Sequence, residues 1–344
     1  MPKTIRVATI QMNAQPAPLR DRLARAETLV AQATQAGAEL VVLPEVFNTG
    51  YEYSPQNYTR AEPMDGPTPA WMRKTAAGYH IHLAGSFLHA QENRIHNTLL
   101  LVAPDGQEWR YDKNYPWVWE RAYFEPGRDI TAADTALGKI GFLICWDVAH
   151  PALWQKYAGK VQLMVVCSCP PNAFDLTFVF PDGTRLLSQN TGPLVQMIKR
   201  ASDPTFGDHL RRQACALGVP VAQATSTGLF SSSLPGPAIS LAFLSLMYPP
   251  LLKYASRFAG ARIESGYFNE TYLADPAGTV LQRMPPGQEG FALSPIALSD
   301  APAPAKQKQP AFGIPASAYL LDMIANRLLA SEYRRHTGRH SGPA

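Results

Sequence analysis

Short apolar runs alternate with segments of helical periodicity from the start of this chain, and this alternation restricts its fold more than any other feature. Residues 5–11 (IRVATIQ) have strand character, and residues 19–37 place apolar side chains at helical spacing before a glycine stop. Residues 38–45 (AELVVLPE) then have the pattern of a buried strand. Chains with this order of elements fold as layered α/β domains in which helices cover a sheet.

The same order continues to residue 298. The pattern predicts further strands over 81–89, 137–145, 161–169, 219–225 and 290–298, and helices near 68–79, 151–159 and 203–218. Residues 97–113 and 270–284 each read as a hairpin, with Asp105-Gly106 and Pro276-Ala277-Gly278 as turn signals. We therefore predict one α/β domain over residues 1–298 with mixed strand directions.

The remaining residues, 299–344, form a separate unit in this prediction. Residues 299–313 are a linker rich in proline and alanine. Beyond it, Leu320, Ile324 and Leu328 recur at a spacing of four, which predicts an amphipathic helix that packs on this chain or on a second copy.

Two stretches, about 174–204 and 229–266, are longer than the fold requires and are expected to be lids, binding loops or contact regions. The second contains an apolar segment, 237–258, interrupted by Pro249 and Pro250. A membrane-spanning helix needs about 20 apolar residues, so this segment is too short and too broken to span. Three interpretations remain: a core or subunit contact, a flap over a site, or a surface that touches lipid.

The bulk composition excludes several classes of protein. A net charge of +4 without a long basic block does not suggest nucleic acid or a firm association with an anionic membrane. The first residues lack the features of a signal peptide, and the four cysteines form no CxxC pair. We expect reduced thiols and a cytoplasmic location.

Three polar residues follow predicted strands, where the groups of α/β active sites tend to lie: Glu45, Lys113 and Cys145. A thiol is mostly protonated at neutral pH, so a carboxylate that takes its proton makes it a nucleophile. A fixed ammonium stabilises the negative charge that builds up when the thiolate attacks a carbonyl or nitrile carbon. The three side chains together suffice for acyl transfer through a thioester.

The segments around these residues resemble the motifs of the carbon–nitrogen hydrolase family, also called the nitrilase superfamily. They are VVLPEVFNTGY around Glu45, WRYDKNYPW around Lys113 and GFLICWD around Cys145, in the order the family has them. The resemblance extends from about residue 5 to 298. It implies a four-layer α-β-β-α sandwich that assembles into homodimers or larger homo-oligomers.

The resemblance also implies roles for these residues. Glu45 would be the general base, Lys113 the stabiliser of the tetrahedral intermediate and Cys145 the nucleophile. A second glutamate usually assists, and WERAYFEPG assigns this role to Glu120, with Glu125 as the alternative. The backbone N–H of Trp146 would also face the developing charge.

The match is incomplete after the nucleophile. Where the family commonly has an arginine-aromatic-proline-glutamate string, this chain reads Ala149-His150-Pro151-Ala152. His150 either replaces part of that function or caps the following helix. Asp147 stands where nitrilases often have glutamate, which favours amides over nitriles. The expected substrate-binding residues are mostly aromatic, which suggests a hydrophobic or aryl acyl group: Tyr51, Trp117, Trp119, Phe124, Trp146, His150 and Asn172.

The resulting prediction is an enzyme that hydrolyses a non-peptide amide to an acid and ammonia or an amine. The alternatives are a nitrilase, an N-acyltransferase, an N-carbamoyl amide hydrolase and a non-catalytic protein on the same fold. The mechanism needs no cofactor. His80 and His82 share a strand face without an evident third ligand, so no metal site is expected.

Overall fold

The computed structural model describes residues 3–172, 175–188, 204–302, 304–311, 314 and 316–338. Within them, twelve strands form one hydrogen-bonded network with two halves. The first half contains, in spatial order, β5 (Glu108–Asp112), β4 (Arg94–Val102), β3 (His82–Gln91), β2 (Leu40–Val42), β1 (Thr4–Asn13) and β16 (Gly290–Ala297). The second contains β6 (Ala132–Thr135), β7 (Gly138–Ile144), β8 (Leu163–Ser168), β11 (Val221–Thr227), β14 (Tyr272–Ala274) and β15 (Val280–Arg283). The halves join where Met12 and Asn13 of β1 pair with β11.

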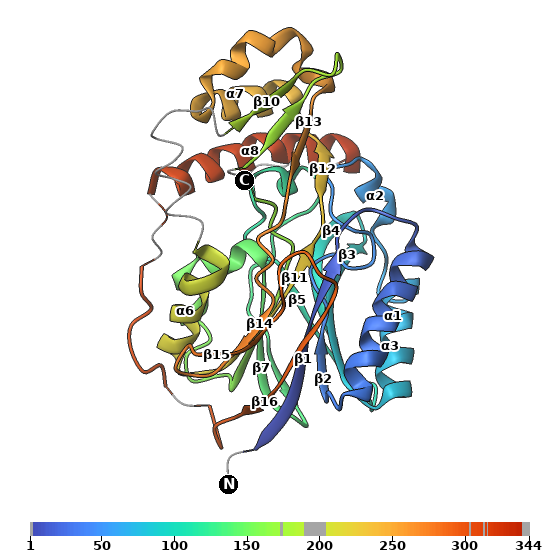
Figure 1. The fold of residues 1–344 in the computed structure, drawn as a ribbon, viewed down its shortest axis with the longest axis vertical. Coiled ribbons are helices and arrows are strands. Elements are labelled where there is room, and N and C mark those ends of the chain that lie inside the picture. The colour runs from blue at the N-terminus through green and yellow to red at the C-terminus, as the bar shows by residue number, and fades with distance from the viewer. Residues whose placement is uncertain are drawn as a thin grey trace.

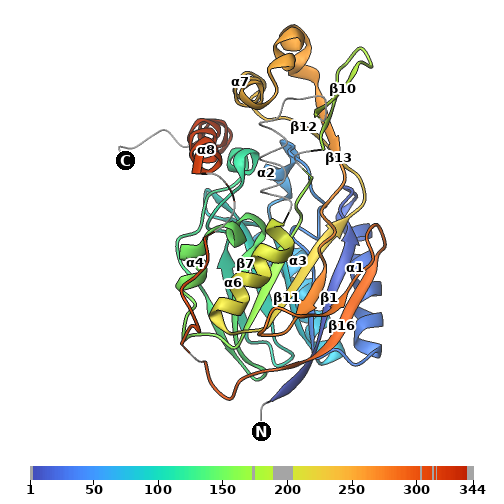
Figure 2. The same cartoon turned by 60° about the vertical axis from the view of Figure 1, so that its left-hand side comes forward.

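The two halves stack as sheets, and helices cover their outer faces (Figures 1 and 2). Ile5 and Val7 contribute to the core between the sheets, whereas Ala8 and Ile10 contribute to the core under the helices, as strand alternation requires. The helices are α1 (Leu19–Gln35) and α3 (Pro67–Tyr79) on one side, and α4 (Pro151–Gln155) and α6 (Leu210–Leu217) on the other. The predicted α-β-β-α sandwich is confirmed.

Most predicted elements lie where the sequence placed them. The two hairpins are β4–β5 and β14–β15, and the helix expected near 68–79 is α3. The helix expected over 203–218 begins with a π-helical turn, η4 (Thr205–His209), and α6 follows it directly. A short helix, α2 (Gln56–Arg60), follows the Glu45 loop.

The two long stretches pair with each other to form a small projecting unit at one end of the sandwich (Figure 1). Its four-stranded sheet consists of β10 (Arg185–Leu187), β9 (Thr177–Val179), β13 (Arg262–Ser265) and β12 (Phe230–Ser233). The apolar segment 237–258 forms α7 (Pro237–Met247) and most of η5 (Pro249–Gly260), which bury Leu244 and Leu251 but expose Leu246 and Leu252. Residues 174 and 189–203 of the first stretch lie outside the described residues.

Neither α7 nor any other helix in the described ranges has the length and apolar character needed to cross a membrane.

The C-terminal helix, α8 (Ala316–Thr337), exists as predicted, but it packs through a different face. Leu320, Ile324 and Leu328 are 52%, 46% and 50% exposed. The helix instead buries Leu329 and Tyr333, and it lies across the end of the sandwich between the main body and the projecting unit (Figures 1 and 2). The recurring leucine and isoleucine positions are therefore not the packed face within one chain.

Candidate active site

Lys113 lies at the centre of a buried group of charges. It follows β5, and its Nζ atom is 2.9 Å from Oε1 of Glu45 and 2.7 Å from Oε2 of Glu120. Burial lowers the pKa of Lys113, but attraction to Glu120 and Glu45 outweighs burial and raises that pKa well above its ordinary value. The lysine therefore stays charged, held between two carboxylates.

Glu45 is oriented by donors from three other segments. Besides Lys113, the side-chain amide of Asn97 on β4 donates to Oε1 at 2.7 Å, and the backbone N–H of Cys169 donates to Oε2 at 2.9 Å. Burial raises the pKa of Glu45, while Lys113 and a hydrogen bond with the Cys145 thiol oppose that rise. A carboxylate with a raised pKa beside a thiol is suited to accept its proton.

Cys145 occupies the sharp turn between β7 and η2 (Cys145–Ala149). Its φ angle is +47°, in the left-handed region that residues other than glycine rarely adopt, so this backbone is strained. Burial raises the pKa of the Cys145 thiol, and Glu45 raises it further, whereas Lys113 lowers it. The thiol is therefore protonated at neutral pH and needs a base to become a nucleophile.

Glu120, rather than Glu125, is the second glutamate in contact with the lysine. It lies on the short helix η1 (Val118–Ala122), where Oε1 accepts from the Tyr51 hydroxyl at 2.7 Å and Oε2 accepts from the Trp117 N–H at 2.7 Å. Glu125 instead forms an ion pair with Arg94 at 4.0 Å. The Glu120 carboxylate, fixed on both oxygens, holds the ammonium in place.

Asp147 connects the nucleophile turn to the lysine loop and does not face the charged group. Its two oxygens accept from the Ile144 N–H at 3.0 Å, the Tyr115 N–H at 2.8 Å and the Tyr111 hydroxyl at 2.7 Å. Burial raises the pKa of Asp147 to about 7, although these donors oppose the rise. Asp147 therefore links the turn that carries Cys145 to the segment that follows Lys113.

Some of the expected substrate-binding residues border the charged group. Tyr51 contacts Glu120, and the Phe124 ring centroid is 5.9 Å from Lys113 Nζ. Trp146 follows the nucleophile directly, and its ring lies 6.5 Å from that of Trp117. Tyr51 and Phe124 therefore contact the charged group, and the Trp117 and Trp146 side chains lie on the segments next to Glu120 and Cys145.

The other three expected residues have different surroundings. His150 stacks on Tyr115, with ring centroids 3.5 Å apart. Trp119 is buried and donates from Nε1 to Ser240 of α7 at 3.0 Å, and Asn172 donates to Asp175 at 2.8 Å. Trp119 and Asn172 therefore engage the projecting unit and a neighbouring loop instead of the charged group.

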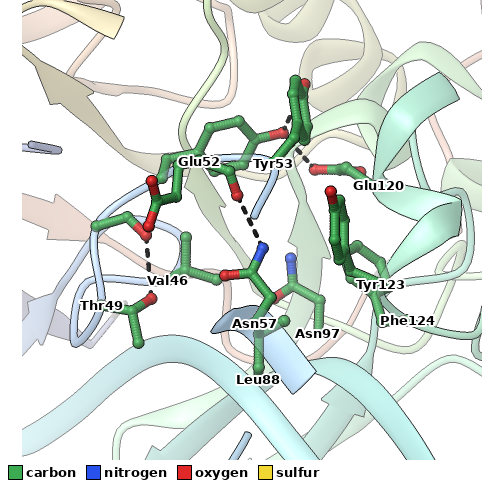
Figure 3. Close-up of a pocket in the computed structure, with 12 residues that line it drawn as sticks. Val46, Thr49, Glu52, Tyr53, Asn57, Leu88, Asn97, Glu120, Tyr123 and Phe124 are labelled. Atoms are coloured by element: carbon green, nitrogen blue, oxygen red, sulfur yellow. Dashed lines mark hydrogen bonds between the residues drawn. The ribbon is translucent and has the colours of Figure 1, made fainter. Parts of the chain in front are cut away.

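A small cavity of about 20 Å³ lies behind the charged group, and Figure 3 shows the residues that line it. Asn97, Glu120 and Phe124 form one side of it, and Val46 and Thr49 form the other. This volume is about what one water molecule requires. Asn97 was not predicted from the sequence, although a polar side chain directly before the apolar run TLLLV of β4 is a usable signal.

The fold and the site together define a class of protein: an α-β-β-α sandwich with a buried cysteine, lysine and glutamate after strands and a second buried glutamate on a short helix. Residues 6–303 match the carbon-nitrogen hydrolase family, and the chain belongs to that family.

Comparison with individual proteins agrees with this assignment. The chain is 32% identical over 175 residues to the omega-amidase NIT2 of Danio rerio, covering 46% of this chain and 59% of the relative. It is 29% identical over 164 residues to a nitrilase of Pyrococcus abyssi, covering 45% of this chain and 61% of the relative. The chain thus spans about three fifths of the length of the curated relatives it matches.

A solved structure of similar fold is the carbon–nitrogen hydrolase superfamily protein XC1258 of Xanthomonas campestris, with a TM-score of 0.62, 17% identity and 99% of both chains covered. An amidase from Nesterenkonia sp. has a TM-score of 0.60 at 19% identity, covering 85% of this chain and 90% of its own.

Proposed function

We propose that this chain hydrolyses an amide to a carboxylic acid and ammonia or an amine through a thioester on Cys145. The observation that carries the proposal is the buried group of Glu45, Lys113 and Glu120 around the strained Cys145 turn. Relatives named as nitrilases and omega-amidases support the same reaction type.

In the proposed reaction, Glu45 takes the proton of the Cys145 thiol as the sulfur attacks the carbonyl carbon. The Lys113 ammonium stabilises the oxyanion that forms. Glu45 then gives its proton to the departing nitrogen, which leaves as ammonia or an amine, and the thioester remains. Water, deprotonated by Glu45, attacks the thioester and releases the acid and the thiol. Glu120 keeps Lys113 positioned throughout.

The acyl group is expected to be hydrophobic or aromatic. Tyr51 and Phe124 contact the charged group, Trp117 and Trp146 lie on the adjoining segments, and aromatic rings favour contact with apolar or aryl groups. Turnover confined to small aliphatic amides such as acetamide would contradict this part of the proposal.

Ammonia release from benzamide and benzonitrile, each compared with acetamide, distinguishes the candidate reactions. We expect release from benzamide that does not require an added amine and that disappears in Cys145→Ala. Release of ammonia and benzoate from benzonitrile would identify a nitrilase instead. Turnover that requires an acceptor such as hydroxylamine would identify an acyltransferase. Turnover of N-carbamoyl compounds alone would identify an N-carbamoyl amide hydrolase.

Other features stay predictions. We expect a cytoplasmic location, as for a chain whose cysteines stay reduced, and a homodimer or larger homo-oligomer, as the family resemblance implies. The division into a hydrolase unit, 1–298, and a C-terminal unit, 299–344, is likewise proposed. Sedimentation of the purified chain tests the subunit number.

A further inference from the structure

The C-terminal helix α8 contacts the active-site segments through one of its faces. The Tyr319 hydroxyl donates to the Ala149 carbonyl oxygen at 2.6 Å, in the turn that begins with Cys145. The Asp322 Oδ1 atom accepts from the Val118 N–H at 2.9 Å, in η1, which carries Glu120. The Tyr333 hydroxyl accepts from the Ile95 N–H at 2.8 Å, on the strand that carries Asn97.

These three helix residues share a face, because 319, 322 and 333 are separated by close to whole turns of an α-helix. The three sites that they contact are the segments that carry Cys145, Glu120 and Asn97. All three helix residues lie beyond residue 303, where the match to the family ends.

The contact between Asp322 and the Val118 N–H matters because Val118 has a strained backbone conformation. Val118 has a φ angle of +30°, and a β-branched residue in this region is a genuine conformational outlier. Along the chain, Val118 lies between Trp117, whose N–H donates to Glu120 Oε2 at 2.7 Å, and Glu120 itself. An acceptor at Val118 therefore stabilises a backbone conformation on which the position of Glu120 depends.

Asp322 also contributes to the charge of the site. Its residue is partly exposed, but its carboxylate faces inward, and burial raises its pKa to about 7 while the Val118 N–H and the Trp146 indole oppose the rise. The charged groups that act on it are Glu120 of η1, which raises the pKa, and Lys113, which lowers it. The same carboxylate thus lies near both the Glu120 segment and the residue after the nucleophile.

We infer that Asp322 is a positioning residue of the active site: from outside the family domain it holds Val118, and through Val118 it holds Glu120 against Lys113. The inference rests on the proposed function for the role of Lys113. Without this acceptor the Val118 N–H is buried and unsatisfied, and the turn relaxes. The ammonium then moves away from the position at which it stabilises the oxyanion and the thiolate.

The test compares Asp322→Ala and Asp322→Asn with Arg327→Ala, a change at an exposed residue of the same helix. The asparagine carbonyl can still accept from Val118. We expect Asp322→Ala to lower kcat on benzamide about tenfold or more, since displacements near 1 Å can cost up to about a hundredfold, with KM within about twofold. Asp322→Asn and Arg327→Ala should both stay within about threefold of the wild type with Tm nearly unchanged, whereas Asp322→Ala should lower the Tm because the buried Val118 N–H loses its acceptor.

A second readout does not depend on amide turnover. The rate at which iodoacetamide alkylates Cys145 should fall in Asp322→Ala and recover in Asp322→Asn, because a displaced Lys113 stabilises the thiolate less. If the wild type fails to hydrolyse any amide, this difference still tests the inference, so the two failures are distinguishable.

Two results would overturn the inference: kcat and alkylation rate in Asp322→Ala equal to those of the wild type, or equal losses in Asp322→Ala and Asp322→Asn that follow a lowered Tm. If Asp322→Ala does not fold, Tyr319→Phe replaces it, because it removes the hydroxyl that contacts Ala149 and keeps the ring. Tyr319→Phe should lower the rate of Cys145 alkylation severalfold and keep the Tm of the wild type. An unchanged alkylation rate would contradict the inference that α8 positions the active-site segments.

Discussion

Glu45→Gln should lower kcat/KM on the preferred amide by about a thousandfold while the protein keeps its fold. General base catalysis by a positioned side chain contributes about a hundredfold to ten-thousandfold, and here one carboxylate serves in both the acylation and the hydrolysis of the thioester. Glutamine has nearly the same shape and keeps an oxygen that can accept from Lys113 and Asn97, so only the Cys169 N–H, which donates to the other oxygen, loses its acceptor. Lys113 also keeps its ion pair with Glu120.

Steady-state kinetics measures the loss of kcat/KM, and circular dichroism shows whether the variant keeps its fold. Glu125→Gln is the matched control, because Glu125 lies five residues from Glu120 in the same loop and pairs with Arg94 instead of Lys113. It should stay within about threefold of the wild type, because the Glu125 carboxylate pairs with the exposed Arg94 and does not contact the charged group. A Glu45→Gln protein that retained a tenth of the activity would show that Glu45 is not the base.

Lys113→Met should abolish turnover and also lower the free energy of unfolding by about 3–5 kcal/mol. The two effects have different causes. Turnover is lost because nothing stabilises the oxyanion. Stability is lost because the carboxylates of Glu45 and Glu120 then share a buried site without the ammonium between them.

The stability loss should depend on pH in a defined direction. Burial already raises the pKa of Glu45, and removing Lys113 removes an interaction that lowers it. An acid whose folded-state pKa lies above its unfolded value favours folding at low pH and loses that contribution as pH rises through the folded pKa. The destabilisation of Lys113→Met should therefore be smaller at pH 5 than at pH 8.

Urea unfolding at the two pH values measures this difference. Lys139→Met is the control, because Lys139 pairs with Asp134 in a largely exposed ion pair, and such pairs contribute about 0–1 kcal/mol. A Lys113→Met protein as stable as the wild type at pH 8 would contradict the description of the buried charges.

The sequence was sufficient for the features that local patterns encode. Strand alternation and helical spacing placed the layers, and Glu45, Lys113 and Cys145 could be selected because each follows a predicted strand. These strands, β2, β5 and β7, are not neighbours, but they run in the same direction, so the positions after them meet at one end of the sandwich. Glu120 was predicted from its motif, and the structure places it on Lys113.

The contacts that depend on distant segments could not be predicted in the same way. Asn97 and the Cys169 N–H reach Glu45 from β4 and from the end of β8, and no spacing in the chain relates them to it. The role of Asp147 depends on donors from the lysine loop. A local sequence pattern can identify a candidate residue, but it does not predict which distant residue that candidate contacts in the tertiary structure.

The C-terminal helix shows the same limit from another side. Hydrophobic periodicity selected Leu320, Ile324 and Leu328, which are exposed, whereas the packed face combines Leu329 and Tyr333 with the polar contacts of Asp322. Periodicity finds an apolar stripe, but it does not say whether the stripe meets its own chain. The polar contacts of α8 depend instead on backbone groups of the active-site segments on which the helix lies.

The central claim is that Cys145 carries the acyl group, and intact-protein mass spectrometry after rapid acid quench tests it most directly. The wild type mixed with benzamide should gain the mass of one acyl group, located on the peptide that contains Cys145 and removed by hydroxylamine, as a thioester requires. Cys145→Ala should gain nothing. Turnover of benzamide with no such adduct in the presteady state, or an adduct on Cys167, Cys169 or Cys215 instead, would contradict the account.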